Sequence, residues 1–107
     1  MNVVIVGPDR DLATALEERG ADLARVDGLA NGDTLRAAGI GEADLLVLTD
    51  VGEATGIAVA RELNPGLRVV VYAPDTLPEF VRGQVDLAVA PGVLAPSVVA
   101  EELTGSG

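Results

Sequence analysis

The sequence contains no cysteine, histidine, lysine or tryptophan. Without cysteine and histidine, the chain has no disulfides, no thiolate or imidazole metal ligands, no cysteine nucleophile and no histidine base. Its two aromatic residues, Tyr72 and Phe80, are too few for platforms that stack the bases of single-stranded nucleic acid. The remaining functional groups are carboxylates, arginines and hydroxyls, and no spaced pair of them indicates a catalytic site, so we expect no enzyme.

Long apolar runs are also missing, although 49% of the residues are hydrophobic. No run approaches the roughly 18 residues that a membrane-spanning helix needs. The first residues carry no basic region followed by an apolar stretch, which is the pattern of signal and transit peptides. We therefore expect a cytoplasmic protein that does not insert into membranes.

Charge of one sign dominates, with 17 acidic residues, 7 arginines and a formal net charge of -10. Such a field repels nucleic acids and anionic membranes, so neither is an expected partner. Excess carboxylates repel one another unless salt screens them, and the Debye length falls to about 3 Å near molar salt. The acidic, lysine-free composition therefore indicates a halophilic protein.

Short apolar segments alternate with amphipathic segments along the 107 residues, as in β-α units around a parallel sheet. We predict one domain over residues 1–103 and a flexible tail over 104–107. The fold class is α/β: a three-layer, Rossmann-like fold with a five-stranded parallel sheet and helices on both faces. The expected strands are 2–6, about 21–26, 45–48, 68–72 and about 86–90.

Helix boundaries can be predicted from capping residues. Asn31 or Asp33 is expected to cap a short helix, and Thr76 with Glu79 three residues later forms a plausible capping box for another. Ligands of such folds bind where the parallel strands end. We therefore expect a crevice at the carboxyl ends of the first and third strands.

Residues 37–50, 60–71 and 86–95 resemble the N-terminal nucleotide-binding domain of potassium-transport regulators, the TrkA-N or RCK family. The resemblance spans nearly the whole chain, but one strand-helix unit of the family is absent after residue 27. Its removal converts the family's strand order into 2-1-3-4-5. The resemblance implies control of cation transport by protomers that assemble, hence a homodimer and a cation transporter as partner.

A nucleotide site in this family would include six residues here: Gly7, Asp9, Arg10, Asp27, Thr49 and Asp50. The glycine-rich turn is degenerate, because only its first glycine, Gly7, is kept. Asp9 is placed to cap the following helix, while Arg10 could hold a phosphate or lie in solvent. Asp27 follows Gly7 at the spacing of a ribose-binding carboxylate, but Asp-Gly is also common in simple turns. The ligand would be NAD(H) or an adenine nucleotide.

The chain also resembles the receiver domains of two-component systems, which share the five-unit order. Asp9 would stand in their acidic pocket and Asp50 at the phosphorylated carboxylate, and the two could hold Mg²⁺. Ala90 replaces the required lysine, and Tyr72-Ala73 replaces a small hydroxyl residue, so a working phosphoacceptor is not expected.

Two functions follow. The first is a non-catalytic regulatory or ligand-sensing domain related to TrkA-N, with a degenerate nucleotide site. The alternative is a pseudo-Rossmann protein-interaction module without nucleotide binding. It would use the edge strand and the helix at residues 78–82, with Phe80 and Val81 as exposed contacts.

Overall fold

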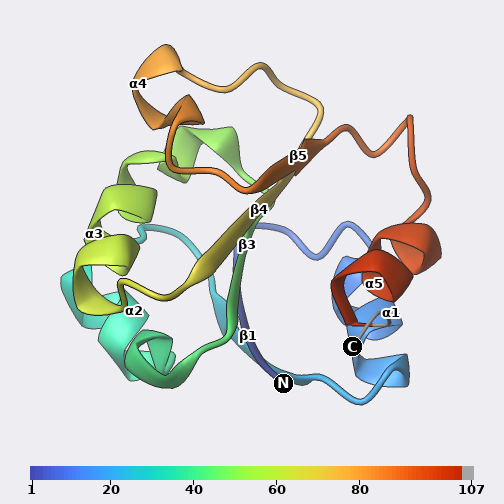
Figure 1. Ribbon diagram of the computed structural model, residues 1–107, viewed down its shortest axis with the longest axis horizontal. Coiled ribbons are helices and arrows are strands. Elements are labelled where there is room, and N and C mark those ends of the chain that lie inside the picture. Colours follow the sequence, from blue (N-terminus) through green and yellow to red (C-terminus); the bar gives the residue numbers. More distant parts are fainter. Residues whose placement is uncertain (105–107) are drawn as a thin grey trace.

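The computed structural model describes residues 1–104, which form a five-stranded parallel sheet between two layers of helices (Figure 1). Short β-branched and leucine-rich runs form the strands, because a parallel sheet covered on both faces requires continuous apolar segments. The strands are β1 (Asn2–Val6), β2 (Asp22–Val26), β3 (Leu45–Leu48), β4 (Arg68–Tyr72) and β5 (Leu87–Val89). The helices are α1 (Leu12–Glu18), α2 (Gly32–Ala37), α3 (Thr55–Leu63), α4 (Glu79–Arg82) and α5 (Pro96–Thr104).

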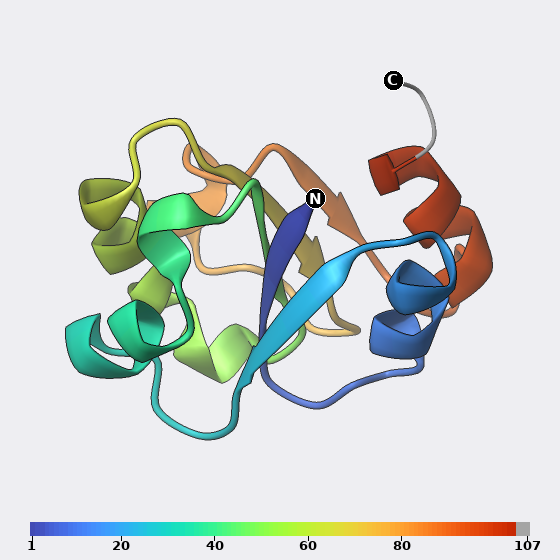
Figure 2. The ribbon, with the colours of Figure 1, turned by 90° about the horizontal axis from the view of Figure 1, so that it is seen from below.

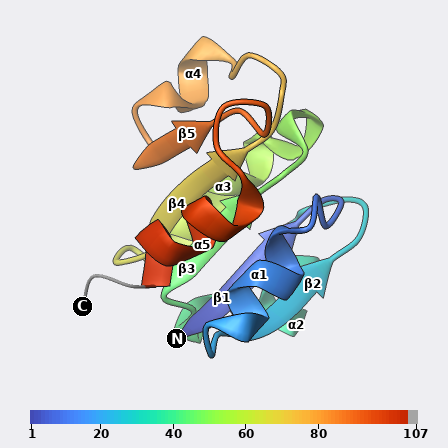
Figure 3. The same ribbon diagram turned by 90° about the vertical axis from the view of Figure 1, so that its right-hand side faces the viewer.

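The strand order is β2-β1-β3-β4-β5, as predicted (Figure 3). Every neighbouring pair is parallel, and Val6 lies between Val26 and Leu48 in the register. This is the flavodoxin-like order, in which the connection reverses direction between β1 and β3. The predicted fold class is therefore confirmed.

Helices cover both faces of the sheet (Figure 2), and one apolar core lies on each face. Alternate residues of each strand point to opposite faces, so Ile5 packs toward α1 and α5, whereas Val4 packs toward α2 and α3. Tyr72 is buried in the core that Ile5 forms with α1 and α5, and its hydroxyl donates to the carbonyl oxygen of Leu94 at 3.0 Å. Aliphatic side chains thus fill almost all of the interior, as the scarcity of aromatics requires.

The predicted helix ends are correct in one place and wrong in another. Asn31 caps α2, and a reciprocal capping box joins it to Thr34. The capping box predicted at Thr76 and Glu79 does not form, because Pro78 precedes α4 and provides no side-chain cap.

The carboxyl end of the chain is helical further than expected. Thr104 ends α5, and its hydroxyl accepts from Arg19 Nε at 2.7 Å, so it is not part of a tail. The rest of the predicted tail, 105–107, lies outside the described residues. Across 1–104, no helix has the length and apolar content needed to span a membrane.

Candidate functional site

The turn after β1 brings the carboxyl ends of β1 and β3 into contact. Gly7 is buried with φ 111°, a conformation that favours glycine. A Cβ at this position would lie 2.5 Å from Thr49 Oγ1 and 2.9 Å from the amide nitrogen of Asp50. Only a residue without a side chain therefore allows this close approach.

Thr49, which follows β3, is fully buried. Its hydroxyl lies 3.1 Å from the carbonyl oxygen of Val6 and also contacts the carbonyl oxygen of Pro8. A hydroxyl carries one hydrogen, so it donates to one of these oxygens at a time. The Thr49 side chain, which was predicted to line a ligand crevice, thus hydrogen-bonds the backbone of the turn after β1.

Asp9 and Arg10 occupy the rest of this turn. Asp9 Oδ1 accepts from the amide of Ala13 at 2.8 Å, which confirms that its carboxylate satisfies a donor at the start of α1. Arg10, with φ 51°, donates from Nε to the carbonyl oxygen of Thr49 at 2.9 Å. The position where a bound anion would meet the helix therefore already holds a carboxylate.

Asp27 and Asp50 lie at the margin of this group. The Asp50 carboxylate accepts from the amide of Gly52 at 2.9 Å and caps a short 3-10 turn, Val51–Glu53. Asp27 is exposed and pairs with Arg25 at 3.6 Å. Arg25 also donates to the carbonyl oxygen of Gly7 at 3.1 Å, so it links the predicted ribose position to the turn.

The structure thus brings four predicted residues together, and we call this group the β1–β3 site: Gly7, Asp9, Arg10 and Thr49. Binding of a nucleotide by these residues with Asp27 and Asp50 stays a prediction. Arg25 was missed, although a charged residue inside the strand, between Ala24 and Val26, was the signal. Among residues 1–104, no group of three or more acidic side chains is placed to hold a metal ion.

A cavity of about 390 Å³ lies elsewhere, between the end of β4 with the segment that follows it and the whole length of β5. Apolar residues of both strands and of the segment before α4 line it, including Val71, Leu77 and Ala88. Arg82 and Asp75 add opposite charges at its margin. Sequence reasoning did not find this cavity, because its walls come from three separate segments that carry no common motif.

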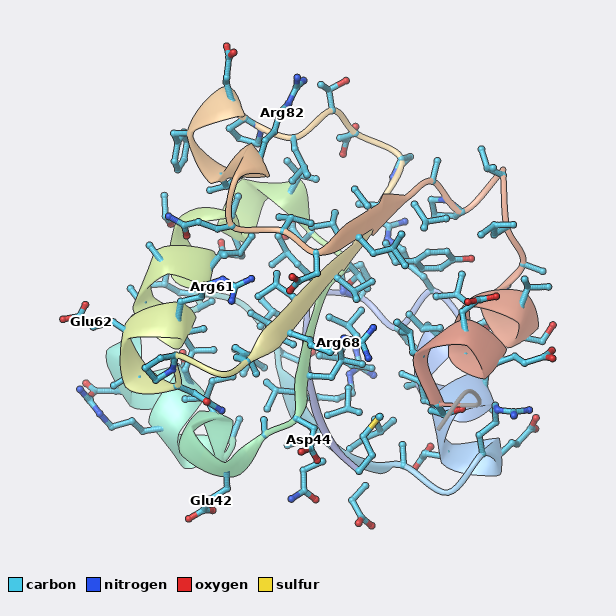
Figure 4. The ribbon with its side chains drawn as sticks, in the orientation of Figure 1. Glu42, Asp44, Arg61, Glu62, Arg68 and Arg82 are labelled. Atoms are coloured by element: carbon cyan, nitrogen blue, oxygen red, sulfur yellow. The ribbon has the colours of Figure 1, made fainter. Side chains whose placement is uncertain are left out.

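An ion pair lies beside the cavity, where Arg61 of α3 reaches toward the sheet (Figure 4). Asp86 Oδ2 accepts from the amide of Val69 at 2.7 Å and from Arg61 Nη2 at 3.0 Å. The Val69 amide and then the Arg61 guanidinium hold the pKa of Asp86 below its usual value, against partial desolvation that acts in the opposite direction. Asp86 thereby anchors the start of β5 to β4.

We expect Asp86→Asn to lower the free energy of unfolding by about 1 kcal/mol at pH 7, because the charge-assisted bond to Arg61 is lost. A lowered folded-state pKa stabilises the protein above the unfolded-state pKa, near 3.8. This contribution disappears as the pH falls through the folded-state pKa. In urea unfolding between pH 7 and pH 2.5, the free energy of unfolding should therefore fall less steeply with falling pH for Asp86→Asn than for the wild type. Equal slopes would contradict the role of Asp86.

Exposed apolar side chains are most frequent in the last part of the described chain. Of the six large hydrophobic side chains that are exposed among residues 1–104, four lie on α4, on β5 or after β5, and we call them the β5 surface: Phe80, Leu87, Val93 and Val98. Of the helices that carry two of them, α4 packs on the α3 face of the sheet and α5 on the opposite face, with β5 at the edge between them. The expected contact residue Phe80 is 65% exposed. Val81 is instead fully buried, because one side of the short helix α4 must pack on the core formed with α3.

Comparison with solved structures shows the fold. A CheY-like response regulator receiver domain protein from Methanospirillum hungatei has a TM-score of 0.72 and 19% identity, covering 95% of this chain and 89% of that chain. An orphan response regulator of H. pylori has a TM-score of 0.71 and 17% identity, and the match covers 96% of this chain and 92% of that chain. A Burkholderia thailandensis protein described as a candidate pilus assembly protein has a TM-score of 0.68 and 21% identity, and the match covers 96% of this chain and 94% of that chain. No curated protein matches the chain.

These neighbours contradict the resemblance to the TrkA-N or RCK family, and with it the link to potassium transport. The three segments that carry the resemblance contain the strands β3, β4 and β5 and turns with glycine. Such features recur in many doubly wound sheets, because the same packing rules apply to all of them.

The scan against family models gives a match over residues 3–103, which includes every strand core and nearly all of α5. The matching model is described as a family of unknown function, DUF7126. Since the match covers almost the entire chain, the protein belongs to the DUF7126 family.

Proposed function

We propose that this protein is a non-catalytic, cytoplasmic interaction module that binds another protein chain through the β5 surface. The observation that carries the proposal is a contrast between the two ends of the sheet. In the β1–β3 site, polar side chains hydrogen-bond the chain's own backbone, whereas four of the six exposed large hydrophobic side chains of residues 1–104 lie on β5 or on α4 and the segments that flank β5 in the chain. Large exposed apolar areas are typical of binding faces.

Phosphorylation of the receiver type is disfavoured by the same geometry. The carboxylate of Asp50 caps the turn at Gly52 and is not directed into a shared acidic pocket by any contact of the described residues. Ala73 follows β4 and Ala90 follows β5, where the resemblance requires a hydroxyl and a lysine. The receiver-like scaffold is therefore proposed to act without a phosphoacceptor.

A second candidate, nucleotide sensing, is supported by the spacing of Asp27 from Gly7. It can be tested by melting the protein in molar KCl with NADH, ATP or AMP. A ligand at about 100 times its dissociation constant would add near 2.7 kcal/mol of stability. We expect no rise in melting temperature with any of the three. A rise that Asp27→Ala abolishes would favour nucleotide sensing over our proposal.

The interaction proposal is tested by site-specific photocrosslinking in cells of the source organism. A benzophenone amino acid replaces either Phe80, which is 65% exposed, or Leu29, which is 64% exposed. The two positions match in exposure, but only Phe80 belongs to the β5 surface. We expect a discrete adduct from position 80, identified by mass spectrometry, and none from position 29. No adduct from position 80, or equal adducts from both, would overturn the proposal.

A further inference from the structure

The two edges of the sheet are formed by β2 and β5 (Figure 3), and their residues differ in charge. The outer strand β2 carries the exposed charged residues Asp22 and Arg25, and charges on an edge strand discourage pairing with another strand. The opposite outer strand, β5, is Leu-Ala-Val, and both Leu87 and Ala88 are exposed. Only β5 thus presents an uncharged, accessible edge.

The backbone of β5 has a defined outward direction. The carbonyl oxygen of Val89 accepts from the amide of Ala73 at 3.3 Å, so the backbone groups of Val89 face the β4 side. Successive residues of a strand direct their backbone groups to opposite sides. The N–H and C=O of Ala88 therefore point away from the sheet.

Charge distribution favours a second copy of this chain as the occupant of this edge. The chain has a net charge of -10, so contact between two copies through most faces brings carboxylates together. Residues 87–100, which include β5 and the start of α5, contain no charged residue. Two copies can therefore approach through this segment with the least repulsion.

We propose that two copies of this chain pair through β5, with the two β5 strands antiparallel about a two-fold axis at Ala88. The two five-stranded sheets would then form one continuous sheet. This inference rests on the proposed function and names its partner. Ala88 would exchange both backbone hydrogen bonds with Ala88 of the partner subunit. Leu87 would lie opposite Val89 of the partner subunit, so the facing side chains are apolar and no like charges meet.

Sedimentation equilibrium of the full chain in molar KCl tests the pairing. We expect the mass to rise with concentration toward twice 10.8 kDa, and dimerisation to strengthen with salt, which screens the repulsion. Ala88→Glu should weaken dimerisation about tenfold or more, because two carboxylates then face each other. The matched control Ala58→Glu, on an exposed position of α3, should leave it within about twofold.

Two measurements address the backbone directly. Ala88→Pro removes the outward N–H and is compatible with an edge strand, so it should give a folded monomer by circular dichroism. In the wild type, the Ala88 amide should exchange with solvent more slowly as protein concentration rises. A dimer that Ala88→Pro leaves intact, or an Ala88 amide with concentration-independent exchange, would overturn the inference.

The two proposals fail separately. A wild-type chain that stays monomeric in molar KCl, together with an adduct between position 80 and a different protein, would overturn the pairing and leave the interaction module standing. Absence of any adduct from position 80, with a dimer that still depends on Ala88, would overturn the role of Phe80 and leave the pairing standing.

Discussion

Gly7→Ala is expected to lower the free energy of unfolding by about 3 to 5 kcal/mol, the largest effect of a single methyl group in this chain. The added Cβ would meet Thr49 Oγ1 at 2.5 Å and Asp50 Cβ at 2.8 Å, both held by the end of β3. Alanine must in addition adopt φ 111°, which L residues rarely occupy. Because native domains are stable by only about 5 to 15 kcal/mol, urea unfolding should show a large shift of the midpoint.

Gly28→Ala provides the matched control for this effect. Gly28 also has a positive φ, 89°, but nothing lies within 4 Å of a Cβ added there. We expect a loss of about 1 kcal/mol, from backbone strain alone. If both variants lost the same stability, the close approach of β1 and β3 would not be the cause, and the description of the β1–β3 site would be wrong.

Thr49→Asp is expected to destabilise the protein by about 3 kcal/mol at pH 7. The carboxylate would be buried against the carbonyl oxygens of Val6 and Pro8, which can donate no hydrogen bond to it. The loss should be smaller at pH 4, because burial raises the pKa of the new carboxyl group and the protonated form can donate to one oxygen. Chemical unfolding at the two pH values measures both effects.

Thr49→Ser keeps the hydroxyl and removes one methyl group, so its loss should be about 1 kcal/mol and independent of pH. A stable Thr49→Asp variant would have a different meaning. Arg10, whose Nε donates to the carbonyl oxygen of Thr49, would then have turned to pair with the new carboxylate. In that case the β1–β3 site can accommodate an anion, and the nucleotide hypothesis would gain support.

Much of the fold could be predicted from the sequence, because the strands are short runs of Val, Leu and Ile separated by glycine turns. The bounds of β1, β3 and β4 were predicted to the residue, and β2 and β5 within one residue at each end. Asn31 was one of the two residues predicted to cap α2, and such a cap can be predicted because its side chain bonds within its own helix. Such local signals need no knowledge of the rest of the chain.

Other features depended on contacts between distant segments. The side of α4 that is buried could not be read from four residues, so Val81 was expected outside although the core encloses it. The roles of Arg25 and Thr49 arise from bonds to the turn at residues 7–8, which are 18 and more than 40 positions away. The resemblance to TrkA-N was wrong because it rested on segments whose pattern reflects packing rather than chemistry.

The sequence by itself determined the α/β class, the exclusion of thiol and imidazole chemistry and the acidic character, because these follow from composition and local periodicity. The strand order was predicted only through the resemblance to known families. Only the tertiary structure decided that Asp9, Arg10 and Thr49 hydrogen-bond the chain's own backbone where a ligand crevice was expected, and that β5 is an edge strand without charged residues. Whether a polar side chain is free to bind a ligand depends on whether backbone groups from distant parts of the chain already hydrogen-bond it. Which backbone groups lie close enough to do so is determined by packing in three dimensions.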